Sequence, residues 1–152
     1  SSDLRGANLS ETDCSGAKFN GADLDGCAFK KATLRKMDFS NRDLRDVDFS
    51  EADLRRADLR KSNLRKINFF KADLRKTLFT EANLTGAYLS STLLQDTDFQ
   101  WANLSKAVLR YSLNLTAVQI QSAKIDRETK VPHYLRIDWI SETDFCCKEN
   151  SV

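Results

Sequence analysis

The chain has 152 residues, of which 41% are hydrophobic and 30% charged, and its formal net charge is +2. This length fits a single domain, and the absence of any run of 18 apolar residues excludes a membrane-spanning helix. The charge is uneven, because residues 30–76 hold 15 Lys or Arg against 8 Asp or Glu, and this net +7 excludes a uniformly acidic surface.

A five-residue period runs through the chain from Leu4 to Leu109. Every fifth residue in this range is Leu or Phe, with Cys14 as the one exception, so that the series holds 14 Leu, 7 Phe and one Cys. A fixed internal period predicts a stack of structural repeats.

Each five-residue unit has the same internal order. The side chain two places before the Leu or Phe is mostly small, as at Ala52 and Ala72, and the residue directly before it is usually Asp or Asn. This alternation places the small residue and the Leu or Phe on one face of an extended segment. The two residues after it are polar, charged or Gly, and all five glycines hold the second of these positions, which predicts a tight turn there.

A coil that turns a corner every five residues is the arrangement that buries every Leu and Phe. In an α-helix, a period of five advances about 140° per step, so the apolar residues would not share one face. Successive coils would pair as parallel strands about 4.8 Å apart. Because Leu recurs at every twentieth position from Leu4 to Leu104, we expect four sides per coil. The predicted core includes Leu24, Phe39, Leu44, Phe49, Leu64, Phe69 and Leu84.

These units resemble the A(D/N)LXX repeat of the pentapeptide-repeat protein family. Examples are Ala22-Asp23-Leu24-Asp25-Gly26 and Ala82-Asn83-Leu84-Thr85-Gly86, and the resemblance covers residues 2–112 without interruption. It implies an all-β fold, a right-handed quadrilateral parallel β-helix (a solenoid), here of about six coils. Many members of that family come from cyanobacteria and plastids.

After Leu109 the period slips by one residue. We expect three degenerate units, with Leu115, Ile120 and Ile125 as inward centres and Leu113, Val118 and Ala123 as the inward residues two places earlier. The β-helix domain is therefore predicted to span residues 1–126.

Residues 127–152 are predicted to form a C-terminal capping tail. The stretch around Leu135, Ile137 and Trp139 alternates like a strand, but a short helix fits the same residues. Either would cover the open edge of the last coil, as solenoids require. The first coil has no visible cap, so a partner, a missing segment or an end-to-end homodimer through the uncapped coil is expected to cover it.

One edge of the predicted column is basic. Pairs of basic residues recur 20 positions apart and would stack on it: Arg35, Lys36, Arg55, Arg56, Arg75 and Lys76. Two alternatives are open, an anionic partner or a solvated edge whose charge is balanced by Asp53 and Asp73. Arg42 is an anomaly, since it holds an inward position and would have to extend outward at a corner.

Apolar residues at outward positions form a second candidate surface. The residues expected to contact a partner are Phe70, Tyr88, Leu93, Val108 and Tyr111. Outward apolar patches of this kind suggest a contact site. The alternative is that the tail folds back over them.

The sequence does not point to an enzyme. Its single histidine, His133, lies beside Pro132 in the tail, and no GxSxG, GxGxxG or phosphate-binding loop occurs. Without a CxxC pair, no metal site is expected, and no cofactor is expected either. Cys14 and Cys27 hold inward positions, which favours reduced thiols as apolar filler and a reducing compartment.

The function predicted is a rigid, non-catalytic scaffold that binds another protein through its outer faces. The alternative implied by the resemblance is a DNA mimic that binds a type II topoisomerase such as gyrase, which the net-positive middle disfavours. An assembly module fused to an upstream domain and direct nucleic-acid binding are two further readings, and nucleic acid is disfavoured because no aromatic residues interleave with the basic edge. The cytoplasm is favoured over the thylakoid lumen or periplasm.

Overall fold

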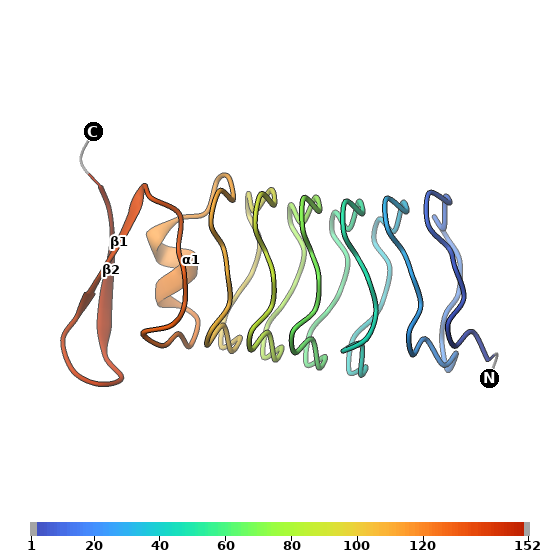
Figure 1. Cartoon of the computed structure of the whole chain (residues 1–152), viewed down its shortest axis with the longest axis horizontal. Helices are drawn as coiled ribbons and strands as arrows, with labels where there is room; N and C mark the ends of the chain where they lie inside the picture. The colour runs from blue at the N-terminus through green and yellow to red at the C-terminus, as the bar shows by residue number, and fades with distance from the viewer. Residues whose placement is uncertain (1–2, 151–152) are drawn as a thin grey trace.

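The structure, a computed structural model, describes residues 3–150 as an elongated column (Figure 1). Isolated parallel bridges join residues 20 positions apart, from Asp3 and Asp23 to Leu93 and Leu113. They recur at nearly every fifth residue, so each 20-residue stretch lies directly against the next along the column. The predicted pairing of successive coils as parallel strands is therefore observed.

Backbone hydrogen bonds tie each unit to both of its neighbours. At Asp53, the amide donates to the Ala32 carbonyl at 2.9 Å, and the next amide, of Leu54, donates to the Asp73 carbonyl at 2.9 Å. The amide of Ala57 then donates to the Leu54 carbonyl at 2.9 Å and closes the corner. These bonds use only main-chain groups, which leaves the outward side chains free for other contacts.

The Leu and Phe of the five-residue period fill the interior of the column. Each of the following residues is at most 3% exposed: Leu24, Phe39, Leu44, Phe49, Leu64, Phe69 and Leu84. Rings one coil apart stack, with centroids 5.6 Å apart for Phe49 and Phe69 and 5.5 Å for Phe79 and Phe99. Burial of each such side chain contributes roughly 1.5–3 kcal/mol to folding.

The corners have left-handed backbone whether or not glycine is present. Gly26 has φ +66°, and the equivalent corner residues Lys36, Arg56 and Lys76 have φ 58°, 60° and 61°. This conformation is unfavourable for residues with a Cβ, so the inter-coil hydrogen bonds must impose it. The glycines therefore mark the turn position correctly, but most corners use other residues.

The predicted degenerate units of residues 110–126 are partly wrong. The segment contains a short helix, α1 (Ala117–Gln121), that begins at a capping box formed by Thr116 and Gln119. Leu115, Ile120, Ala123 and Ile125 are buried as expected, but Leu113 and Val118 are 54% and 74% exposed. Val118 lies on α1, where residues two apart point in different directions. Leu113 precedes the helix and bridges Leu93, so it holds an outward position of the ladder.

The parallel ladder resumes after α1 with a changed spacing. Asn103 bridges Lys124, 21 residues later, and Val108 bridges Lys130, 22 residues later. The spacing between bridged residues thus increases from 20 to 22 across the segment that contains α1. The last bridge lies beyond residue 126, where the sequence predicted the ladder to end.

The tail forms an antiparallel hairpin of β1 (Leu135–Trp139) and β2 (Phe145–Glu149), which selects the strand over the helix for residues 135–139. Figure 1 shows the hairpin beyond α1 at the C-terminal end of the column. The Tyr134 hydroxyl donates to the Ser112 carbonyl at 2.8 Å and accepts from the Leu115 amide at 3.2 Å. Leu135 and Cys147 are each 4% exposed, so the hairpin packs on the column.

Candidate partner-binding surfaces

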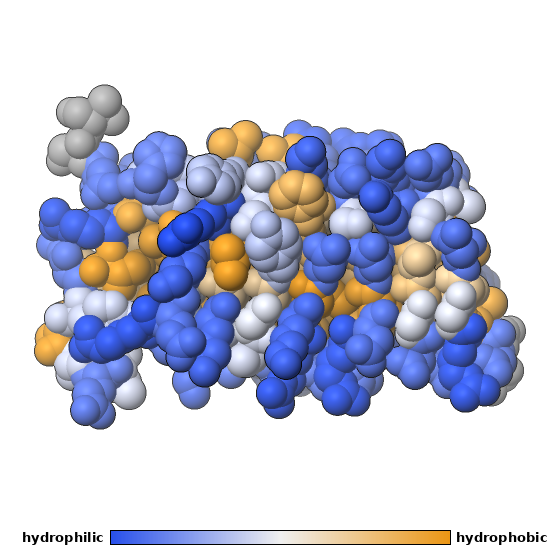
Figure 2. Space-filling view, in the orientation of Figure 1, coloured by the Kyte–Doolittle hydropathy of each residue, from blue (hydrophilic) through white to orange (hydrophobic). Residues whose placement is uncertain are grey.

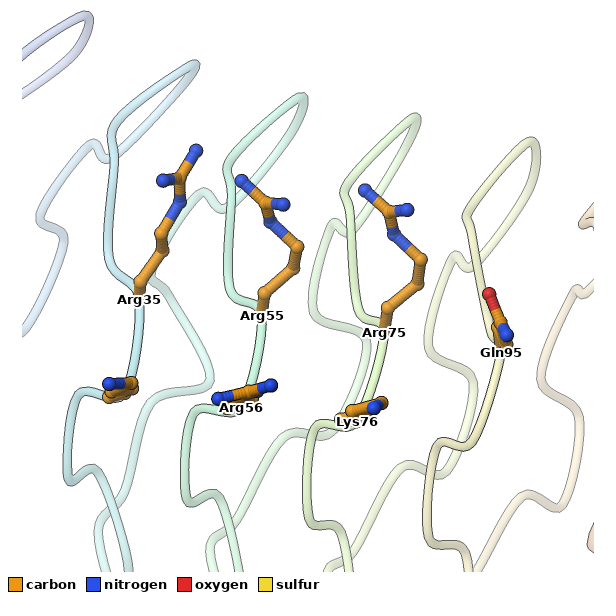
Figure 3. A pocket seen from close by; sticks show the side chains of 7 residues that line it. Arg35, Arg55, Arg56, Arg75, Lys76 and Gln95 are labelled. Atoms are coloured by element: carbon orange, nitrogen blue, oxygen red, sulfur yellow. The ribbon is translucent and has the colours of Figure 1, made fainter.

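The basic edge lies at a corner of the column, where the two turn residues of each unit project outward. Arg35, Arg55 and Arg75 take the first turn position in three successive coils, and the second position holds the basic residues Lys36, Arg56 and Lys76. Figure 3 shows Arg35, Arg55 and Arg75 in one row across the coils, continued by Gln95, with Arg56 and Lys76 in a second row beside it. Together these seven residues line an open groove of about 390 Å³.

Two aspartates form ion pairs with the first row of the basic edge, which consists of Arg35, Arg55 and Arg75. Asp53 accepts from Arg35 Nε at 2.6 Å and from Arg55 Nη2 at 2.8 Å. Asp73 accepts from Arg75 Nη2 at 2.6 Å and lies 3.5 Å from Arg55 Nε. The predicted compensation by Asp53 and Asp73 is thus observed for this row.

These contacts change the acid–base properties of Asp53. Partial burial acts to raise the pKa of Asp53, but hydrogen bonds from Arg55 and Arg35 outweigh it and lower the pKa from 3.8 to about 2. The hydrogen bond to Asp53 in turn raises the pKa of Arg55. Asp53 therefore stays ionised and restrains both guanidinium groups over the whole physiological range.

The second row of the basic edge has no such partners. Among residues 3–150, no carboxylate oxygen lies within 4.0 Å of Lys36, Arg56 or Lys76. The groove thus combines a row of restrained arginines with a parallel row of cations that no acidic side chain neutralises.

The charged part of the groove has defined ends. At the equivalent corner of the following coil stand Gln95 and Asp96, and at that of the preceding coil stand Ser15 and Gly16. The doubly basic corner therefore occurs in three successive coils. Gln95 was not among the residues predicted for this edge, although its place 20 residues after Arg75 identifies it.

The predicted apolar patch is centred on two rings. Phe70 stacks on Tyr88 with centroids 5.8 Å apart, and Lys71 Nζ lies 5.1 Å from the Phe70 centroid. Tyr88 is 43% exposed and bridges Val108, which is half-buried. The structure therefore brings Phe70, Tyr88 and Val108 to one face of the column.

The two other residues predicted for the patch lie beside it. Leu93 is half-buried and bridges Asp73 and Leu113, on the next face. Tyr111 is a corner residue with φ 62° and is 71% exposed. Since Tyr88 and Tyr111 stay exposed, the tail does not fold over them.

Further apolar side chains are exposed near the C-terminal end. Trp101, Leu113, Val118 and Ile140 are between 54% and 75% exposed. Leu113 and Val118 are exposed against the prediction, because Leu113 keeps the outward ladder position of Leu93 and Val118 lies on α1. Figure 2 shows that hydrophilic residues dominate one face of the column, with apolar residues in separate areas between them.

Arg42 does not extend outward at its corner as the sequence suggested. Its guanidinium donates to the Ala22 carbonyl at 3.2 Å and to the Phe19 carbonyl. Both acceptors belong to the preceding coil, so Arg42 lies between coils and is half-buried.

No constellation typical of catalysis is present among residues 3–150. His133 is exposed, and its ring lies edge-on to Tyr134 with centroids 5.6 Å apart. Within the same residues, no group of three or more His, Cys, Asp or Glu side chains could hold a metal ion. The four cysteines are free thiols, and no helix of the described chain is long and apolar enough to cross a membrane.

Comparison with protein families identifies the repeats. A family described as "Pentapeptide repeat region" matches residues 1–69, and one described as "Pentapeptide repeats (8 copies)" matches residues 72–110. Among curated proteins, no sequence matches this chain.

Solved structures of similar proteins extend this result. A pentapeptide repeat protein from Nostoc PCC 7120 is 33% identical, with 70% of this chain aligned to 74% of that one and a TM-score of 0.52. A second, from the cyanobacterium Cyanothece 51142, is 22% identical over 86% of this chain and 88% of that one, with a TM-score of 0.56. A third, from the thylakoid lumen of Arabidopsis thaliana, is 27% identical over 70% and 67%, with a TM-score of 0.48.

Proposed function

The chain belongs to the pentapeptide-repeat family, and from that premise we propose that it is a rigid, non-catalytic scaffold that binds another protein through its outer faces. The observation that carries the proposal is the stacked pair of Phe70 and Tyr88. Both side chains stand on a ladder whose backbone is fixed by hydrogen bonds on either side. Tyr88 is 43% exposed and Phe70 is half-buried, and aromatic side chains are enriched at protein interfaces and among the residues that dominate binding energy there.

Members of this family form right-handed β-helices, and at that level the predicted fold class is correct. We further propose a quadrilateral cross-section and about six coils. The predicted division into a β-helix over residues 1–126 and a cap over 127–152 moves by a few residues in this proposal, because the bridge between Val108 and Lys130 extends the ladder to residue 130. The support is the 20-residue register of the bridges, with four bridging positions per repeat of that register. An end-to-end homodimer through the N-terminal coil is part of the same proposal.

A pull-down tests the aromatic pair. The double variant Phe70→Ser with Tyr88→Asn carries at each site a residue that the chain itself uses one coil away, Ser50 or Ser90 and Asn68, so the ladder should stay intact. We expect the double variant to lose the main protein recovered by the parent chain from a lysate of its source cells. Trp101→Ser, an exposed aromatic outside the predicted patch, is the matched control and should recover it. An unchanged set of recovered proteins for the double variant would remove this patch from the proposal.

Binding to gyrase as a DNA mimic is the alternative, and it requires a continuous acidic surface. Residues 30–76 have a net charge of +7, and Asp53 and Asp73 are paired with arginines. Both observations favour the scaffold. Inhibition of gyrase supercoiling by the purified chain at micromolar concentration would favour the alternative.

A further inference from the structure

The groove of the basic edge carries a large excess of positive charge in a small space. Six basic side chains line it, and two carboxylates, Asp53 and Asp73, contact them, so four charges are left (six minus two). The cations of the second row, Lys36, Arg56 and Lys76, stand at corners whose backbone is fixed in the left-handed conformation. Their Cα positions are therefore set by the ladder and not by the side chains around them.

The spacing of these cations indicates the shape of the anion that fits. Coils paired as parallel strands lie about 4.8 Å apart, so the row from Lys36 to Lys76 spans about 9.6 Å. Residues i and i+7 of an α-helix are separated by about 10.5 Å along its axis, with i+3 or i+4 between them on the same face. In an extended peptide, the same-face residues i, i+2 and i+4 span about 13 Å, which exceeds the row.

We infer that this groove binds an acidic α-helical segment of a partner protein, laid along the column with carboxylates at positions i, i+4 and i+7. Each carboxylate would pair with one cation of the second row. The arginines of the first row, restrained by Asp53 and Asp73, form the opposite wall and add positive potential without changing conformation on binding. The ends of the groove at Gly16 and Gln95 limit the acidic footprint to about two helical turns.

The lining residues also argue against a single-stranded nucleic acid. The groove is lined by six Arg or Lys side chains and Gln95, and no aromatic side chain is among them. Non-specific binding of single strands relies on bases that stack on aromatic rings. The nearest stacked rings described above, Phe70 and Tyr88, belong to a different surface.

The inference rests on the proposed function only in taking the partner to be a protein, and it concerns a different surface. The proposal for the basic groove can therefore be refuted while the proposal for the aromatic patch stands, and the reverse. A double variant of Phe70 and Tyr88 should bind an acidic helix as tightly as the parent chain does. This separates the two proposals in one binding assay.

In the test, a labelled synthetic peptide is titrated with the protein at low salt, and binding is measured by fluorescence anisotropy. The probe is a labelled helical peptide of about 16 residues, with three glutamates at i, i+4 and i+7 in an Ala- and Gln-based sequence whose helicity is checked by circular dichroism. The control peptide has the same composition with glutamates at i, i+2 and i+4. We expect the first peptide to bind more tightly than the second, and its affinity to fall as salt is raised.

Protein variants locate the site. The triple variant Lys36→Gln, Arg56→Gln, Lys76→Gln removes the cations of the second row, and since no acidic side chain among residues 3–150 pairs with them, the fold should be unaffected. We expect about tenfold weaker binding, from three exposed ion pairs of about 0.5 kcal/mol each. The matched control, Lys18→Gln, Arg65→Gln, Lys66→Gln, removes the same charge from exposed positions outside the groove and should bind like the parent.

Three results would overturn the inference. Equal affinity for the two peptides would show that helical spacing is not recognised. Equal losses in the two triple variants would show that net charge alone attracts the peptide. Tighter binding of an oligothymidylate of similar charge would assign the groove to nucleic acid.

Discussion

Two parts of the column follow the same repeat but are held together differently. In the middle, around Asp53, every unit donates to the coil before and the coil after. Nearer the N-terminus, no backbone hydrogen bond among the described residues joins segment 16–26 to segment 35–45, although both flanking stretches are paired. The bridges expected between residues 18 and 38 and between 23 and 43 are likewise not formed there.

Arg42 lies in this unpaired segment. It occupies an inward position that holds Ala22 one coil before and Ser62 one coil after. Its guanidinium donates to the Ala22 carbonyl, where the Asp43 amide of the next coil would otherwise donate, and to the Phe19 carbonyl, which also accepts from the Ala22 amide. A cleft of about 520 Å³ lined by Ala17 and Met37, among others, lies beside the opened ladder. Ile67 holds the equivalent inward position in a coil that is fully paired, with the Tyr88 amide donating to its carbonyl at 2.9 Å. The comparison teaches that a large apolar side chain is accepted at this position, whereas the guanidinium of Arg42 competes for a backbone acceptor.

The largest predicted effect comes from one substitution made in both regions. Phe19 and Phe79 belong to the same wall, but Phe79 is fully buried and Phe19 is 8% exposed beside the opened ladder. We expect Phe79→Ala to lower the free energy of unfolding by about 3–5 kcal/mol. Phe19→Ala should cost about 1–2 kcal/mol, because its coil opens locally at lower cost. Urea denaturation followed by circular dichroism gives both values, and equal losses would refute the distinction between the regions.

Replacement of Arg42 should restore the pairing between segments 16–26 and 35–45. The variant Arg42→Ser carries the residue type found one coil later, at Ser62, which would allow the two segments to pair. The amides of Asp38 and Asp43 would regain backbone acceptors, each hydrogen bond adding about 0.5–1.5 kcal/mol. The loss of the two guanidinium bonds offsets this gain, so we expect the free energy of unfolding to change by about 1 kcal/mol or less. Hydrogen exchange at Asp38 and Asp43 should slow markedly. Exchange at parental rates would mean that another residue holds the ladder open.

The smallest predicted effect concerns acid stability in the well-paired region. Because the pKa of Asp53 is lowered to about 2, its ionised form stabilises the fold above about pH 4, and that contribution is lost as the pH falls towards 2. With allowance for solvent screening, we expect Asp53→Asn to lower the free energy of unfolding by about 0.5–1 kcal/mol at pH 7.

The pH profile provides the check on this assignment. The difference between Asp53→Asn and the parent should shrink steadily as the pH falls towards 2, where Asp53 is protonated in the unfolded chain and about half protonated in the folded one. Asp46→Asn is the control, because Asp46 is exposed and pairs with no basic side chain among residues 3–150. It should leave stability nearly unchanged at every pH. A difference between Asp53→Asn and the parent that is as large at pH 2 as at pH 7 would assign the effect to packing.

Most of the column could be predicted because its inward positions are set by local alternation. Phe39 and Leu64 are buried because each lies two places after another inward position, and no distant contact is needed to know this. The stacking of Arg55 above Arg75 and their pairing with Asp73 follow from the same 20-residue register.

The parts that could not be predicted depend on competition between elements. Val118 fits the predicted inward series, but the capping box at Thr116 starts a helix that turns it outward. Arg42 was recognised as anomalous, yet whether its side chain would leave the column or enter the ladder depends on carbonyls in another coil. Local patterns contain neither piece of information.

The left-handed corners have a consequence for how such a surface can change. Trp101, Tyr111, Glu81 and Lys106 all occupy them with φ between 56° and 62°. Chemically unrelated side chains thus share one backbone shape, and none of them is required by the interior. Mutations at the corners can therefore change charge or aromaticity at regular intervals along the molecule without changing its backbone fold.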